Sequence, residues 1–146
     1  MQIFLSHTGE DAFEADLLQL TLERWLADLN VKVWSYLRDQ STAERRVSGE
    51  ILSQVRRSDA MLYLVSPATL DGGANQTIEL GYAEALEKRI EVMLHRLSYD
   101  DLKAAGRKVP ISVLEGSCTP ATDWRKVAQS LREHLILSAP GNALKD

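Results

Sequence analysis

Residues 60–88 read AMLYLVSPATLDGGANQTIELGYAEALEK, and this stretch decides the fold class. The apolar run at 60–66 predicts a strand that is buried on both faces. The sequence Asp71-Gly72-Gly73 then interrupts the pattern, and a helix is predicted from about Asn75 to Lys88. A buried strand that leads through a turn into a helix is the repeating unit of parallel sheets covered by helices.

The same alternation extends along the chain. Strands are predicted at 2–6, 31–37, 60–66, 90–95 and, more weakly, at 109–114, where Pro110 suits an edge strand. Helices are predicted over about 13–29, 47–57, 75–88 and 124–135, whereas 98–108 fits either a short helical turn or a surface loop. The first helix has a wide apolar face, formed by Phe13, Leu17, Leu18, Leu20, Leu22, Trp25, Leu26 and Leu29. We therefore expect an α/β, flavodoxin-like three-layer fold with a five-stranded parallel sheet in the order 2-1-3-4-5 and helices on both faces.

Composition and charge restrict the classes of function. The chain has 146 residues, 45% hydrophobic and 26% charged, which is typical of one soluble domain, expected at 1–139 with a flexible tail at 140–146. The net charge is −4 and no basic stripe with interleaved aromatic residues is present, so nucleic acid is not an expected partner. The single cysteine, Cys118, excludes an internal disulfide, and no apolar run approaches the ~18 residues that span a bilayer. A cytoplasmic protein without a membrane partner is predicted.

The ligand site is expected at the carboxyl ends of strands one and three, because in this strand order the loops there splay apart into a crevice. Strand one ends in Ser6 and His7, and strand three ends in Ser66. Small hydroxyl residues allow close approach of a sugar or phosphate, although they also commonly cap the following helix. Metal binding is not expected, because the histidines, His7, His95 and His134, are widely separated along the chain.

Glu79 is the candidate catalytic residue. It stands in the first turns of the predicted helix 75–88, one step from an apolar stripe made by Ile78, Gly81, Tyr82 and Ala85. The positive end of the helix favours an ionised carboxylate, which suits stabilisation of a ribosyl cation or nucleophilic attack better than proton donation. The alternative is a helix-entry glutamate that only complements the helix dipole.

Two stretches resemble TIR domains, namely IFLSHTGED at 3–11 and SDAMLYLVSPATLDGGANQTIELGYAEAL at 58–86. The resemblance covers about residues 1–97. In that family the glutamate of a Ser-Pro, spacer, Glu-Leu-x-x-Ala arrangement is the catalytic residue of NAD cleavage, and the matching segment here is Glu79-Leu80-Gly81-Tyr82-Ala83. The resemblance, which is to the bacterial NAD-cleaving type, implies an enzyme in which Glu79 cleaves the bond between nicotinamide and ribose.

The segment VKVWSYLRDQSTAERRVSGEIL at 31–52 is similar to the second strand, loop and second helix of bacterial TIR proteins. By this similarity Trp34 and Ser35 line the nucleotide pocket, although the alternation along the strand equally places Trp34 in the core. Many TIR enzymes carry an aromatic residue four positions before the catalytic glutamate, where this chain has Asn75. A stacking platform is therefore expected from Tyr36, His7 or a neighbouring subunit.

Because nicotinamide is already a cationic leaving group in NAD, its departure needs no general acid. Glu79 would stabilise the ribosyl oxocarbenium ion, and the pyrophosphate and ribose would be held by strand-end groups and Arg45. NAD is thus expected as substrate, with no cofactor and no metal. The substrate-binding residues predicted are Ser6, His7, Trp34, Ser35, Tyr36, Arg45, Ser66 and Asn75.

Three functions remain open. The first is an NAD nucleosidase that forms nicotinamide and either ADP-ribose or a cyclic isomer, and the family suggests a role in antiphage defence. The second is a noncatalytic TIR interaction module. The third follows from IELGYAEALEKRIEV at 78–92, which is similar to the helix of nucleoside 2-deoxyribosyltransferases whose glutamate attacks the anomeric carbon. The TIR resemblance also implies self-association, a rate that depends on subunit assembly, and an effector or sensor protein as partner.

Overall fold

The computed structural model describes residues 1–36, 49–106, 113 and 117–139, and within these residues it forms one five-stranded sheet. The strand order is β2-β1-β3-β4-β5, and each neighbouring pair is parallel. The strands are β1 (Gln2–Ser6), β2 (Lys32–Trp34), β3 (Ala60–Val65), β4 (Arg89–Leu94) and β5 (Cys118–Pro120). The predicted α/β class and strand order are confirmed.

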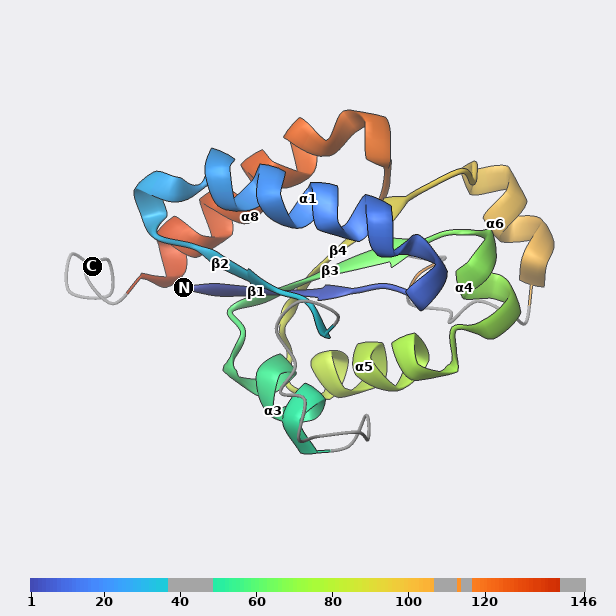
Figure 1. Cartoon of the computed structure of the whole chain (residues 1–146), viewed down its shortest axis with the longest axis horizontal. Helices are drawn as coiled ribbons and strands as arrows, with labels where there is room; N and C mark the ends of the chain where they lie inside the picture. Colours follow the sequence, from blue (N-terminus) through green and yellow to red (C-terminus); the bar gives the residue numbers. More distant parts are fainter. Residues whose placement is uncertain (37–48, 107–112, 114–116, 140–146) are drawn as a thin grey trace.

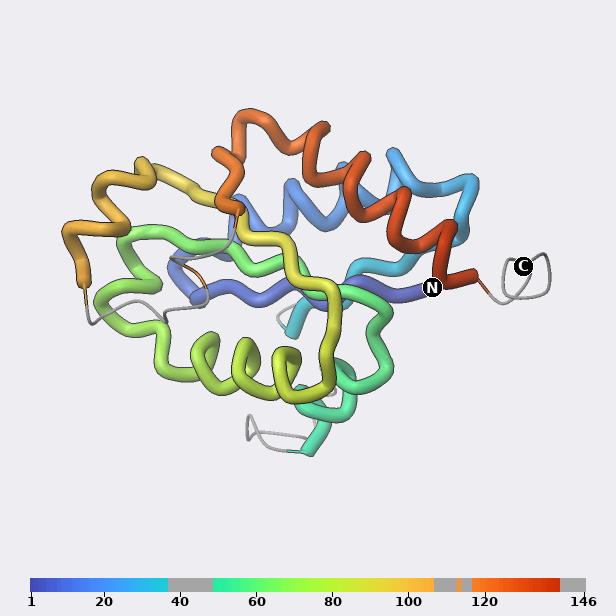
Figure 2. Tube along the Cα trace, turned by 180° about the vertical axis from the view of Figure 1, so that it is seen from behind, coloured from blue at the N-terminus to red at the C-terminus, as the bar shows by residue number. Residues whose placement is uncertain are grey.

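Helices cover both faces of the sheet. The helices α1 (Ala12–Trp25) and α8 (Trp124–Ser138) lie on one face, and α3 (Gly49–Arg57) and α5 (Ala74–Ala85) lie on the other (Figure 1). The short helices η1 (Gly9–Asp11), α4 (Pro67–Gly72) and α6 (Tyr99–Ala105) gather at the carboxyl end of the sheet, and the view from behind shows the same arrangement (Figure 2). Of two more short helices, η2 (Ala27–Leu29) follows α1 and η4 (Ala121–Asp123) precedes α8.

Successive strand residues point into two separate cores. In β1, Ile3 and Leu5 belong to the core beneath α1 and α8, whereas Phe4 belongs to the core beneath α3 and α5. In β3 every residue is buried, because neighbouring side chains point to opposite faces and both faces are covered. The apolar run that predicted this strand therefore reflects burial on two sides.

Two of the predicted strands differ in position or length. The fifth strand of the described sheet is Cys118–Pro120. Of the predicted range 109–114 the structure describes Val113 alone, which is buried and not in a strand. The edge strand ends in Pro120, where the missing N–H is harmless. Pro110, which was expected in the edge strand, lies outside the described residues. The second strand ends at Trp34, earlier than predicted. The predicted tail at 140–146 lies outside the described residues.

Two helices turn a different face to the core than their apolar residues suggested. Four of the eight residues of the predicted apolar face of the first helix are exposed, namely Phe13 (71%), Leu17 (51%), Leu20 (60%) and Trp25 (48%), so half of that face lies in solvent. In α5, Ile78 is exposed and the stripe predicted around it does not face the core. The buried residues of α5 are Gln76, Glu79, Leu80 and Ala83. Glu79 is therefore on the inner face of its helix.

The junction between α4 and α5 sets the start of the helix that carries Glu79. Ser66 caps α4 through a capping box with Thr69. Gly73 then ends α4 and begins α5, and a Cβ at this position would lie 2.5 Å from the carbonyl oxygen of Thr69. Only glycine fits so close an approach without displacement of the backbone. Among the helices of the described ranges, none has both the length and the apolar character needed to cross a membrane.

Candidate active site

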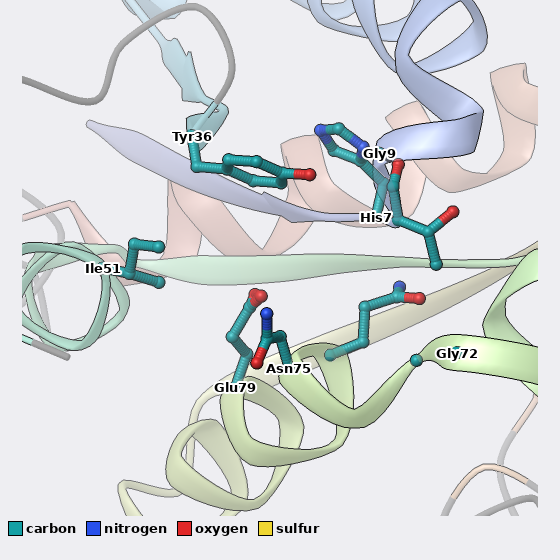
Figure 3. A pocket seen from close by; sticks show the side chains of 10 residues that line it. His7, Gly9, Tyr36, Ile51, Gly72, Asn75 and Glu79 are labelled. Atoms are coloured by element: carbon teal, nitrogen blue, oxygen red, sulfur yellow. Dashed lines mark hydrogen bonds between the residues drawn. The ribbon is translucent and has the colours of Figure 1, made fainter. Parts of the chain in front are cut away.

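A cavity of about 270 Å³ opens at the carboxyl ends of β1 and β3. Its walls come from the loop after β1, the residues after β2, the helix α3, the α4–α5 junction and the first turns of α5 (Figure 3). The lining residues are His7, Thr8, Gly9, Tyr36, Ile51, Gly72, Gly73, Asn75, Gln76 and Glu79. The cavity thus occupies the topological switch point at which a ligand was expected.

Glu79 is a buried acid in the wall of this cavity. Glu79 is only 3% exposed, and the hydroxyl of Ser6 donates a hydrogen bond to its Oε2 over 3.3 Å. Burial raises the pKa of Glu79 to about 8, and the Ser6 hydrogen bond opposes this shift only in part. The expectation that the helix dipole keeps Glu79 ionised was wrong. The dipole acts within the first turn of α5, whereas Glu79 lies beyond that turn, so desolvation dominates its pKa.

His7 and Tyr36 form a stacked pair opposite Glu79. Their ring centroids lie 5.0 Å apart with an angle of 19° between the planes, and Figure 3 shows Tyr36 and Glu79 facing each other across the cavity. Nδ1 of His7 lies 2.7 Å from the carbonyl oxygen of Thr8, and Nε2 lies 3.0 Å from the hydroxyl of Ser35. The carbonyl can only accept, so Nδ1 carries the proton and Nε2 accepts from Ser35. Burial lowers the pKa of His7, which keeps the imidazole neutral.

Asp11 joins the two strand ends behind the cavity. Its Oδ2 accepts hydrogen bonds from the hydroxyl of Ser66 over 2.5 Å and from that of Thr8 over 2.9 Å. Ser66 was predicted to bind substrate, but it is buried, does not line the cavity, and uses its hydroxyl on Asp11 and on the cap of α4. Asp11 and Thr8 therefore fix the loop whose next residue, Gly9, lines the cavity beside the hydroxyl of Tyr36.

The other residues predicted to bind substrate differ in whether they line the cavity. Trp34 is buried in the core and stacks on Phe4 with centroids 5.2 Å apart, so the core interpretation is correct and the pocket interpretation is wrong. Ser35 is buried, is not among the lining residues, and contacts His7, which lines the cavity. Asn75 is an exposed lining residue. Arg45 lies outside the described residues.

Gln76 is a site residue that the sequence analysis missed. It is 1% exposed, lines the cavity, and its Nε2 donates to the carbonyl oxygens of Ser6 (3.1 Å) and Leu64 (2.8 Å). A signal was present, because Gln76 precedes Glu79 by three residues and therefore shares its helix face. Gln76 was missed because the apolar stripe around Ile78 was assumed to be the inner face of the helix.

One group of possible metal ligands lies outside the cavity wall. The nearest ligand atoms of Asp11, Glu14 and His95 lie within 4.8 Å of one another, although the histidine is far away in sequence. Nε2 of His95 lies 3.3 Å from a Glu14 carboxylate oxygen, and Asp11 is occupied by two hydroxyl donors. Nε2 of His95 is buried and makes no hydrogen bond within the described residues, so its contact with Glu14 is an ion-pair distance only.

Comparison with known proteins identifies the class of fold. The chain superposes on the TIR domain of the Toll-related receptor TRR-2 from Hydra magnipapillata with a TM-score of 0.65 and 17% identity, over 89% of this chain and 97% of that one. A metazoan TIR-STING receptor from C. gigas matches with a TM-score of 0.60 and 15% identity, over 94% of this chain and 40% of the receptor. The TIR domains of the activated Roq1 resistosome match with a TM-score of 0.51 and 17% identity, over 92% and 80%.

These matches define the architecture more finely than the flavodoxin-like description does. No family model and no curated protein matches the sequence. The similarity therefore lies in the backbone, and at 15–17% identity it extends to the fold alone. The chain has the fold of a TIR domain, with an acid-containing cavity at its topological switch point.

Proposed function

We propose that this TIR-fold domain cleaves the bond between nicotinamide and ribose in NAD, with Glu79 as the catalytic carboxylate. The observation that carries the proposal is the position of Glu79, which is buried in the wall of a cavity at the switch point and contacts the end of β1 through Ser6. Carboxyl groups that are buried in a cavity and have a strongly raised pKa are concentrated at functional sites.

The chemistry needs few groups. As the bond between C1′ and the pyridinium nitrogen breaks, its electron pair neutralises the nicotinamide, and positive charge develops on the ribosyl carbon. The Glu79 carboxylate stabilises this charge or attacks the carbon. Water then adds to C1′ and loses a proton to give ADP-ribose, or a nucleophile within the ADP-ribosyl group closes a cyclic isomer.

The raised pKa of Glu79 fits a cationic substrate. Near neutral pH the free site holds Glu79 mainly in its protonated form, since the pKa is about 8. A pyridinium ring brought into the same cavity places an opposite charge beside the carboxyl group and lowers its pKa. Binding of NAD would therefore release the proton and create the carboxylate where it is needed.

Tyr36 supplies the aromatic surface that is absent at position 75. It is half-buried, lines the cavity, and is supported from behind by the stacked ring of His7, which Ser35 and Thr8 hold in place. A ring fixed in this way loses little conformational freedom when it stacks on a planar base. We assign the nicotinamide or adenine ring to this surface.

The test is product analysis by chromatography after incubation with NAD. The wild-type protein is expected to release nicotinamide, whereas Glu79→Gln and Glu79→Ala should lose at least about 10²–10³-fold in rate, as expected for removal of a preorganised charge-stabilising group. Glu84→Gln is the matched control, since Glu84 is an exposed glutamate on the same helix. Equal rates for Glu79→Gln and wild type would refute the assignment.

The same experiment separates the other two functions. A deoxynucleoside with a free acceptor base is offered in a parallel reaction, and base exchange without NAD turnover would show a deoxyribosyltransferase-like enzyme. No turnover of either substrate across protein concentrations would favour a noncatalytic interaction module. The roles in antiphage defence and in binding an effector or sensor protein rest on the family resemblance alone.

A further inference from the structure

Ser6 is held twice by α5. Its hydroxyl donates to Glu79, and its carbonyl oxygen accepts from Nε2 of Gln76, three residues earlier on the same helix. Nε2 also donates to the carbonyl oxygen of Leu64 in β3. One side-chain amide therefore connects the first turn of α5 to the ends of both strands that form the switch point.

The orientation of this amide follows from its neighbours. Carbonyl oxygens only accept, so the nitrogen of Gln76 must face Ser6 and Leu64, and both of its protons are used. The oxygen Oε1 is buried and has no hydrogen-bond partner among the described residues. A buried acceptor without a partner costs about 1–3 kcal/mol, which offsets much of the stability that the two donated hydrogen bonds contribute.

We propose that Gln76 is a positioning residue that fixes the first turns of α5 against β1 and β3 and thereby places the Glu79 carboxylate beside the Ser6 hydroxyl. The proposal rests on the proposed function, in which Glu79 acts on the ribosyl carbon. Gln76 does not act on substrate; it acts through Glu79. Displacement of a reacting group by about 1 Å can lower a rate about 10²-fold, so the effect of losing this connection is expected mainly in kcat.

The first test compares Gln76→Met with Gln19→Met. Gln19 is the matched control because it is also a 1% exposed glutamine whose Nε2 donates to a strand carbonyl, that of Val33 over 2.6 Å, but it does not line the cavity. Gln76→Met should lower kcat by roughly 10–10²-fold with KM changed less than about threefold, whereas Gln19→Met should leave both values near wild type. Equal losses of kcat in the two variants, or a change confined to KM for Gln76→Met, would overturn the proposal.

A second test does not depend on NAD. With ¹³C-labelled glutamate, NMR follows the titration of Glu79 in wild type and in both variants. Gln76→Met should shift the Glu79 titration, because the Ser6 hydroxyl no longer meets the carboxyl group in the same geometry, and Gln19→Met should not. If wild type fails to cleave NAD, the proposed function falls while this titration still decides the role of Gln76. An unchanged Glu79 titration in Gln76→Met would refute the positioning role.

A third measurement uses only the wild-type protein, so it holds even if Gln76→Met fails to fold. Two hydrogen bonds from one NH₂ group predict that both side-chain protons of Gln76 exchange with solvent at least about 10²-fold more slowly than those of the exposed Gln129, because exchange requires local opening. Equal exchange rates for Gln76 and Gln129 would show that the connection between α5 and the strand ends does not exist.

Discussion

At the scale of single residues, the ionisation of Glu79 controls the expected pH dependence. Its pKa is raised to about 8, whereas that of His7 is lowered from 6.5 and that of Tyr36 is raised from 10. Between pH 7 and 9 the titration of Glu79 therefore dominates among these three cavity residues. Only the ionised form of Glu79 can stabilise the ribosyl cation, so kcat/KM should increase with pH through a midpoint near 8 and be roughly 10²-fold lower at pH 6 than at pH 9.

Ser6→Ala provides the internal check on this profile. The Ser6 hydrogen bond lowers the pKa of Glu79, so its removal should move the midpoint of kcat/KM to higher pH. Glu79→Gln measures the background rate of NAD decomposition at each pH. A flat profile from pH 6 to 9, or one that falls with pH, would contradict a role for ionised Glu79.

The same carboxyl group is expected to limit stability at high pH. Below the unfolded-state pKa of about 4.5 both states hold the proton, and Glu79 contributes nothing to the pH dependence. Between pH 4.5 and 8 the unfolded chain loses the proton and the folded chain retains it, so the free energy of unfolding falls as pH rises. Glu79→Gln should therefore stabilise the protein at pH 9 by an amount on the order of 5 kcal/mol, and have little effect at pH 4.

Urea denaturation at the two pH values checks this prediction, with Glu84→Gln as the control for loss of a charge on α5. A gain in stability of equal size at pH 4 and pH 9 would mean that packing, and not ionisation, is responsible. A site residue that destabilises its own fold is the expected compromise between stability and activity.

At the scale of elements, the α4–α5 junction determines where Glu79 lies. Gly73→Ala would place a methyl group 2.5 Å from the Thr69 carbonyl oxygen, so α5 must shift. We expect a loss of about 1–3 kcal/mol in the free energy of unfolding together with a reduced kcat. Gly81→Ala is the matched control, because a Cβ at Gly81, also on α5, meets nothing within 4 Å and Gly81 does not line the cavity. Thermal denaturation and NAD turnover of the pair distinguish a specific clash from a general intolerance of alanine, which would affect both variants alike.

The elements also show how far sequence patterns extend. The strand β3 was predictable because two-sided burial requires an unbroken apolar run, and β1 and β4 contain the shorter runs 3–5 and 92–94. The edge strand β5 was not predictable, since Cys118–Pro120 is short and lacks such a run. Glu79 was found through a family resemblance, whereas Gln76 was missed because its significance lies in two long-range contacts with Ser6 and Leu64. Periodicity on α5 even suggested the wrong face, because a buried acid and amide replace apolar residues there.

At the scale of the whole molecule, the sheet separates two kinds of surface. The cavity lies on the α3 and α5 side, while the exposed residues Phe13, Leu17 and Leu20 project from α1 on the opposite side. Their spacing of four and three residues places them on one face of the helix. An exposed apolar surface of this kind is typical of a site for protein contact, and it leaves the cavity free.

We expect this α1 face to support self-association, and the rate of NAD cleavage per molecule to rise with protein concentration. A double variant, Leu17→Glu and Leu20→Glu, should move the half-maximal rate to concentrations at least about tenfold higher, because two buried carboxylates would cost about 1.4 kcal/mol or more in association. Leu137→Glu is the comparison, since Leu137 is 77% exposed on α8. Sedimentation velocity measures assembly and chromatography measures turnover over the same concentrations. A wild-type rate strictly proportional to concentration into the nanomolar range would show that a single chain holds the complete active site, and identical behaviour of the α1 and Leu137 variants would place the contact elsewhere.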